Sequence, residues 1–147
     1  MTRERGSSLI EVLIATSVML TLFGIGLPRL ARMRSPYAID GAARQIAAAV
    51  QVARQRALAR NVSYRMNFNP SARTYAIQRS NGGTWVDEAD LPTQTLPTGV
   101  QIGTVSPNNP VFTARGTLAQ QVTVPLTITG ARSRTVTINV LGKTTVN

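Results

Sequence analysis

The chain has no cysteine and no histidine, and lysine occurs only once, at Lys143. Without cysteine there can be neither a disulfide nor a thiolate metal site. Without histidine the chain lacks the commonest general base and the commonest metal ligand. Its serines and threonines therefore have no imidazole to activate them. We expect neither an enzyme nor a bound cofactor.

Acidic residues are also scarce. Sixteen lysines and arginines stand against six aspartates and glutamates, which gives a formal net charge of +10. Such a charge favours an anionic partner, whether nucleic acid, anionic lipid or an acidic protein, and does not choose among them. Asp87, Glu88 and Asp90 form the one acidic cluster of the sequence. It lacks the ligand spacing of a known calcium loop, so we expect a solvated turn and no metal site.

One long stretch is almost free of charge. Residues Leu9 to Leu27 carry a single charged side chain, Glu11. As a helix they span about 28 Å at roughly 1.5 Å per residue, close to the roughly 30 Å hydrocarbon core of a bilayer. The stretch therefore predicts a membrane-crossing helix. An ordinary secretory signal is the weaker alternative, because the following "GLPRLARMR" contains no small-x-small cleavage site.

Glu11 and the end of the apolar run each allow two interpretations. A carboxylate costs roughly 2.5 to 3.5 kcal/mol at mid-bilayer and less near the interface. Glu11 either extends to the lipid headgroups or pairs with a cation. Gly24, Gly26 and Pro28 weaken the helix at the end of the run. They mark either a plain helix end or a helix that continues in a weakened form.

The N-terminal stretch "RGSSLIEVLIA" resembles the type IV pilin signal, in which a basic leader ends in glycine and an apolar helix with an early glutamate follows. The resemblance implies that a prepilin peptidase cleaves between Gly6 and Ser7 and that Ser7 is then N-methylated. It implies that Glu11 pairs with the N-terminal amine of a neighbouring subunit. It also implies a helix that can melt around Pro28 in the filament. Pilins usually have phenylalanine where this chain has Ser7.

From Ser35 onward the sequence predicts one helix followed only by strands. Ser35 is an expected N-cap, with Pro36 at the first helical position. Small apolar residues at steps of three and four form a narrow stripe that suits close packing on a sheet: Ala43, Ile46, Ala47, Val50, Ala53 and Ala57. Polar residues largely off that stripe are expected to form a solvated face: Arg44, Gln51, Gln55, Arg56 and Arg60.

After Asn61 the hydrophobic period changes to two, which predicts strands. Residues 62–69 and 74–80 predict a first hairpin, and short strands are expected near 84–86, 100–105 and 111–113. A second hairpin is expected at the end of the chain, with Val122, Val124, Leu126 and Ile128 opposite Val136, Ile138 and Val140. Pro125 indicates an edge strand or a bulge. Tyr64, Phe68, Tyr75 and Phe112 are expected in the core. The fold class is α+β, a long N-terminal helix followed by antiparallel sheets.

The second half strengthens the resemblance. "IAAAVQVARQRALARNVSYRMNFN", "VFTARGTL" and "RTVTINVLGKTTV" resemble the pseudopilin H and fimbrial protein T group (GspH/FimT). The resemblance implies a leader at residues 1–6, a membrane and filament-core helix at 7–34, and a periplasmic pilin-like head at 35–147. It implies a single-pass inner-membrane protein that later enters a pilus or pseudopilus. The implied partners are the prepilin peptidase, other pilin subunits and the inner membrane.

One further motif concerns DNA. In "TGARSRT", Arg132 and Arg134 are expected to project into solvent from the turn of the last hairpin, where Lys143 would complete a cationic fork for phosphate oxygens. Fimbrial protein T members that act in DNA uptake have a similar Gly-Arg-x-Arg element, but here Ala131 separates the glycine from the first arginine. Two hypotheses result: a purely structural minor pilin or pseudopilin, or such a subunit that also binds double-stranded DNA without sequence specificity. They are compatible.

Overall fold

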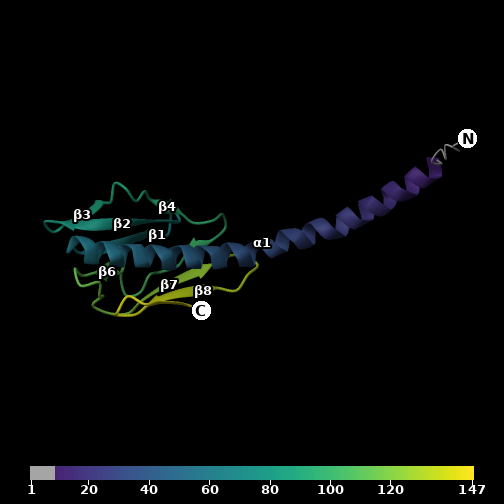
Figure 1. Cartoon of the computed structure of the whole chain (residues 1–147). Helices are drawn as coiled ribbons and strands as arrows, with labels where there is room; N and C mark the ends of the chain where they lie inside the picture. The colour runs from purple at the N-terminus through teal and green to yellow at the C-terminus, as the bar shows by residue number, and fades with distance from the viewer. Residues whose placement is uncertain (1–8) are drawn as a thin grey trace, which may run out of the picture. The chain divides into compact units, whose positions relative to one another are not determined.

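The structure is a computed structural model that describes residues 9–147, apart from the side chains of residues 24–34. The chain divides into two compact units, Met1–Arg34 and Ser35–Asn147. Helix α1 (Leu9–Arg60) contains the boundary between them (Figure 1). Of the two alternatives at Pro28, the continuing helix is therefore the one observed. Among the residues that the structure describes, no helical stretch is both long and apolar enough to cross a bilayer.

The predicted helix start at Ser35 is wrong. Ser35 and Pro36 lie inside α1, and helix precedes as well as follows them. A serine before a proline signals an N-cap only where the chain before it is not helical. Here the preceding residues continue as helix, so Pro36 removes one backbone hydrogen bond without ending the element.

The first sheet has five antiparallel strands, with the order β3-β2-β1-β6 and β4 paired to β2. Their bounds are β1 (Tyr64–Asn69), β2 (Thr74–Asn81), β3 (Thr84–Asp87), β4 (Gln94–Thr95) and β6 (Val111–Phe112). Strands β1 and β2 form the first predicted hairpin, with Met66 opposite Ile77 and Phe68 opposite Tyr75. Alternation along β1 buries Tyr64, Met66 and Phe68 on one face.

The second sheet has four antiparallel strands in the order β5-β7-β8-β9. Their bounds are β5 (Gln101–Ile102), β7 (Val122–Thr127), β8 (Arg134–Ile138) and β9 (Thr144–Val146). The second predicted hairpin is confirmed, because Val122 pairs with Ile138 and Val124 with Val136. Ile128 and Val140 are not part of it, because β7 ends at Thr127. Strand β8 ends at Ile138, so Val140 lies in the turn that follows.

Pro125 lies in β7, which has a neighbour on each side and is not an edge strand. Gly103, just beyond the end of the short strand β5, donates its N–H to the Pro125 carbonyl at 2.8 Å. A Cβ on Gly103 would come within 2.9 Å of Pro125 Cγ. The sheet therefore accommodates the proline ring because a glycine lies beside it.

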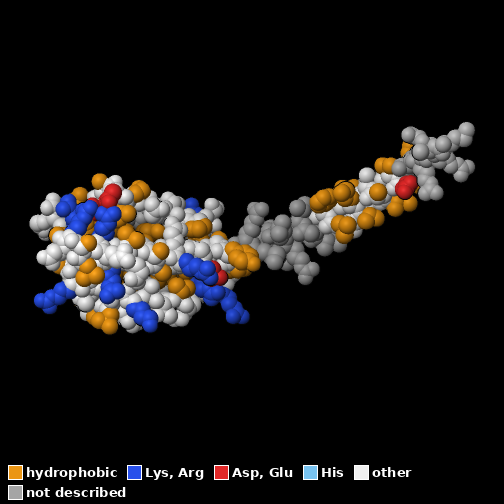
Figure 2. Space-filling view, in the orientation of Figure 1, with side chains coloured by type: hydrophobic (Ala, Val, Ile, Leu, Met, Phe, Trp, Pro, Cys, Tyr) orange, Lys and Arg blue, Asp and Glu red, His pale blue; other side chains and the backbone are white. Residues whose placement is uncertain are grey.

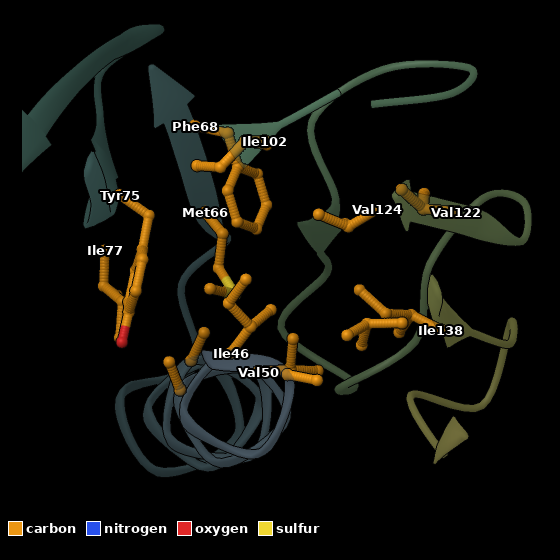
Figure 3. Close-up of a cluster of buried hydrophobic side chains, with 14 of the residues drawn as sticks. Ile46, Val50, Met66, Phe68, Tyr75, Ile77, Ile102, Val122, Val124 and Ile138 are labelled. Carbon is orange, nitrogen blue, oxygen red and sulfur yellow. The ribbon is translucent and has the colours of Figure 1, made fainter. Parts of the chain in front are cut away.

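The core of the second unit lies between α1 and the two sheets (Figure 1). Figure 3 shows Ile46 and Val50 pointing from α1 toward Met66 and Phe68 of one sheet and Val124 and Ile138 of the other. The predicted stripe is buried except for Ala47, which is half-buried, and Ile39, Ala42 and Ala49 extend it. The four predicted core aromatic residues are all buried. The α+β prediction is confirmed.

Candidate functional site

The described N-terminal part of α1, residues 9–23, exposes every side chain. Leu9 is 83% exposed and Leu20 72% exposed, and apolar side chains cover the visible side of this segment in Figure 2. Helices that are apolar all round belong in a protein interior or a membrane. Leaving so much apolar surface in water is unfavourable by roughly 25 cal/mol per Å². This segment therefore requires an apolar environment outside its own chain.

The polar side chains of this segment differ in how they are satisfied. Three hydroxyl groups donate to backbone carbonyls one turn earlier, at 2.7 to 3.0 Å: Thr16 to Val12 and Leu13, Ser17 to Leu13 and Ile14, and Thr21 to Ser17. Such bonds make a hydroxyl tolerable in lipid. Glu11 is the one charged side chain here, and within the described residues it forms no ion pair. Glu11 is thus the lone charge of this segment, and its pairing with a neighbouring subunit stays a prediction.

The structure gives little information on the other residues predicted to act in processing or assembly. Gly6 and Ser7 fall outside the described residues. Pro28 lies within α1, but its side chain is also outside them. The cleavage site and the function of Pro28 therefore stay predictions.

Arg134 does not extend freely into solvent as the sequence predicted. Its Nε donates to Asp40 Oδ1 at 2.6 Å, which joins the start of β8 to α1. The hydrogen bond from Arg134 is the main reason that the pKa of the Asp40 carboxyl lies below its usual value. The same bond raises the pKa of Arg134. Asp40 was not recognised as a partner because 94 residues separate the two side chains.

The predicted fork of Arg132, Arg134 and Lys143 does not form. Arg134 begins β8, whereas Lys143 follows its far end, where its carbonyl accepts the Asn139 N–H at 3.0 Å. Five residues of strand span about 16 Å at roughly 3.3 Å per residue. Arg132 and Lys143 are both exposed, whereas Arg134 is half-buried. Arg132 lines an open cleft of about 550 Å³ between the β7–β8 loop and α1 at Pro36 and Asp40.

Two residues of the acidic cluster form ion pairs with arginines near the end of α1. Glu88 is only 8% exposed; its Oε1 accepts from Arg60 Nη1 at 2.7 Å and its Oε2 from the Tyr64 hydroxyl at 2.6 Å. Burial, followed by the bond to Glu88, raises the pKa of Tyr64. Asp90 pairs with Arg56 at 2.7 Å. The prediction of a solvated acidic turn is therefore wrong for Glu88. Over the described residues, no group of acidic side chains is arranged to hold a metal.

Comparison with known proteins identifies the family. The family model "Type II transport protein GspH" matches residues 42–142. The chain belongs to the GspH family. The match extends from α1 through the first sheet and through strands β5, β7 and β8 of the second to the turn after β8, so it contains the Arg60–Glu88–Tyr64 contacts of this GspH-family chain. The resemblance inferred from the sequence is confirmed.

Solved structures share the fold of this GspH-family chain. The minor pseudopilin EpsH from the type 2 secretion system of Vibrio cholerae has a TM-score of 0.61 at 12% identity, over 75% of this chain and 96% of EpsH. The type IV minor pilin FimU of Pseudomonas aeruginosa has a TM-score of 0.60 at 16% identity, over 74% and 87%. Among curated proteins, no sequence matches significantly. At these identities the likeness concerns the fold.

Glu88→Gln should destabilise the GspH-family head. We expect a loss of about 2 kcal/mol, because the Arg60 and Tyr64 donors lose a charged acceptor in a buried place. Urea unfolding of the full chain in detergent, followed by the fluorescence of Trp85, measures it. Asp90→Asn is the matched control, and we expect a much smaller change because the Arg56–Asp90 pair is exposed. Equal losses would contradict the structural importance of Glu88.

Proposed function

We propose that the chain is a minor subunit of a type IV pilus or of a type II secretion pseudopilus. One observation supports this above all: the GspH-family head is joined to a helical segment, residues 9–23, that is exposed, largely apolar and uncharged except for Glu11. The fold neighbours, a minor pseudopilin and a type IV minor pilin, are consistent with it. In the proposal the helix anchors the chain in the inner membrane, with the head in the periplasm, until the subunit enters the filament.

In the proposed mechanism, different residues provide the affinity between neighbouring subunits and fix the axial position of one helix against the next. Apolar side chains along residues 9–23 supply the affinity, since each large one gains roughly 1.5 to 3 kcal/mol when fully buried. That term is non-directional, so neighbouring helices could slide past one another. A single carboxylate in an apolar layer is costly until a cation approaches it. Glu11 would therefore fix one axial position, at which it meets the N-terminal amine of the adjacent subunit.

This proposal requires a free amine close to Glu11, and hence proteolytic processing. We expect the prepilin peptidase to cleave between Gly6 and Ser7, so the mature chain begins at Ser7 and keeps the apolar helix. Intact mass spectrometry of the membrane-purified protein measures this and also shows whether the terminus carries a methyl group. Gly6→Leu should leave the leader attached. A mature chain that begins after Leu27 would contradict the proposal.

DNA binding remains a hypothesis, and the geometry reduces it to Arg132. Arg134 is paired with Asp40, and Lys143 lies at the far end of β8. If Arg132 contacts a phosphate, Arg132→Gln should flatten the salt dependence of DNA affinity by about one unit of slope. Fluorescence anisotropy with two unrelated duplexes measures the slope. Arg115→Gln is the control and removes another exposed arginine elsewhere in the head. Equal effects of the two changes would indicate diffuse attraction, and absence of binding near physiological salt would leave a purely structural subunit.

A further inference from the structure

The turn between β8 and β9 presents two adjacent aliphatic side chains to solvent. It spans Asn139 to Gly142, closed by the Gly142 N–H donating to the Asn139 carbonyl at 2.8 Å. Val140 and Leu141 occupy its two central positions and are 44% and 65% exposed. Turn centres usually hold glycine, proline, asparagine, aspartate or serine. Exposing two aliphatic residues there is unfavourable in an isolated head. A binding partner that covers them would explain their presence.

The turn is held rigidly against the head. Three further hydrogen bonds fix it: Lys143 N–H to Asn139 Oδ1 at 2.8 Å, Leu118 N–H to the Val140 carbonyl at 2.9 Å, and Gln51 Nε2 to the Gly142 carbonyl at 3.0 Å. Gly142 has a φ of 76°, and a Cβ there would lie 2.7 Å from Arg54 Cδ. Val140 and Leu141 are therefore displayed by a preformed platform, which lowers the entropy lost when a partner binds.

Leu58 on α1 extends this surface. It is 50% exposed and lies against Gly116, where a Cβ would be 3.0 Å from Leu58 Cγ. The Gly116 carbonyl accepts from Arg54 Nε at 3.1 Å, and Arg54 in turn packs on Gly142. Leu58 is thus connected to the turn through Arg54 and Gly116. We call the three exposed side chains Leu58, Val140 and Leu141 the apolar patch.

Three basic residues lie next to the segments that carry the apolar patch. Arg54 and Lys143 border the turn, and Arg115 adjoins Gly116. In the described part of the chain, none of the three is in an ion pair. A docking surface with an apolar centre and a basic rim is complementary to an apolar centre with an acidic rim.

A second copy of this chain does not offer such a surface. Of the acidic residues in the head, Asp40, Glu88 and Asp90 are each bound to an arginine. The remaining one, Asp87, already accepts from Gln78 Nε2 at 2.8 Å. Two copies facing each other through the patch would bring like charges together. The complementary partner is therefore a different protein.

Lipid and DNA fit less well. Within the head, the turn contacts Gln51, about 24 Å along α1 from Ser35 at roughly 1.5 Å per residue. Ser35 is the first residue of the head unit, so the turn lies far along the head from the residue at which the head begins. A DNA backbone would gain little from two aliphatic side chains. We propose that the apolar patch docks onto an acidic surface on a different subunit of the same filament; this inference rests on the proposed function.

Site-specific photo-crosslinking of the full chain in filament-assembling cells tests the partner. A photo-reactive amino acid in place of Leu141 should crosslink to another filament subunit with an acidic head, identified by mass spectrometry. One in place of Val86, an exposed residue on β3, should give at most a tenth of that product. A product with a second copy, with lipid alone or with DNA would overturn the proposal. The proposal would also be overturned if the photo-reactive residue at position 141 gave no product while the same residue in place of Leu13 crosslinked to filament subunits. That result would leave the proposed function intact.

A variant pair tests the energetics. Val140→Ser with Leu141→Ser should reduce the amount of this subunit in sheared filaments about tenfold or more, because truncating central apolar contacts has effects of that size. Val86→Ser is the matched control and should change it less than twofold. Thermal unfolding should show both variants folded. If the double variant is folded and incorporated normally, the patch is no docking site. If a photo-reactive residue in place of Leu13 also gives no crosslink to filament subunits, the result contradicts the proposed function itself and not only the docking site.

Discussion

Ala53→Leu should lower the free energy of unfolding of the head by about 3 kcal/mol, or prevent folding, because overpacking a filled core has costs of this order. Ala53 is fully buried near the C-terminal end of α1, in the cluster that joins the helix to both sheets. One turn away on either side, Val50 and Ala57 are fully buried and Ala49 is 9% exposed, so there is no room for a larger side chain. A leucine would therefore have to displace α1 from the sheets. Urea unfolding of the full chain in detergent measures the loss.

Trp85 is a suitable probe for this experiment, because the guanidinium of Arg65 lies 4.7 Å from its ring centre only in the folded head. Ala48→Leu is the matched control. It makes the same change in the same helix at an exposed position, and we expect little effect, because leucine ranks just below alanine in helix propensity. If both variants unfold at the same urea concentration, α1 does not depend on small residues for its packing.

The elements that local periodicity encodes could be predicted from the sequence. The alanine stripe of α1 follows a step of three and four, and both long hairpins follow a step of two, so a single sequence sufficed for them. The prediction failed where a local signal depends on its surroundings. Ser35 and Pro36 match a helix start, but the preceding residues are helical too. Pro125 matches an edge strand, but Gly103 provides room for it in the sheet interior.

The surface features of the head were harder to predict, because they depend on pairs of residues far apart in the chain. The Arg60–Glu88 pair joins residues 28 apart, and the Arg134–Asp40 pair joins residues 94 apart. No spacing rule connects such positions. Val140 was assigned to a strand because it continues the alternation of β8, yet the strand ends two residues earlier and exposes it. The N-terminal features could be recognised from the sequence, because Glu11 is a lone charge within one contiguous apolar segment.

Glu11→Gln should reduce the amount of this subunit in filaments by about tenfold or more. The variant keeps the size of the side chain and removes the charge that would pair with a neighbour's amine. Charge-assisted hydrogen bonds contribute about 1.5 to 3 kcal/mol, and each 1.4 kcal/mol is a factor of ten. Leader cleavage should be unchanged, and membrane insertion should be at least as efficient as in the wild type, because the charge that opposes it is gone. Immunoblots of sheared filaments against membranes, with mass spectrometry of the mature chain, measure all three.

Thr16→Val provides the control within the same segment. The Thr16 hydroxyl is satisfied inside α1, by the carbonyls of Val12 at 2.9 Å and Leu13 at 3.0 Å. Removing it deletes a polar group that no neighbour needs, so incorporation should stay within about twofold of wild type, whereas the Glu11 variant loses an intermolecular contact. Urea unfolding of the head should be the same in both variants, because neither residue belongs to its core. Normal incorporation of Glu11→Gln would mean that the carboxylate only reaches toward the headgroups and does not set the register between subunits.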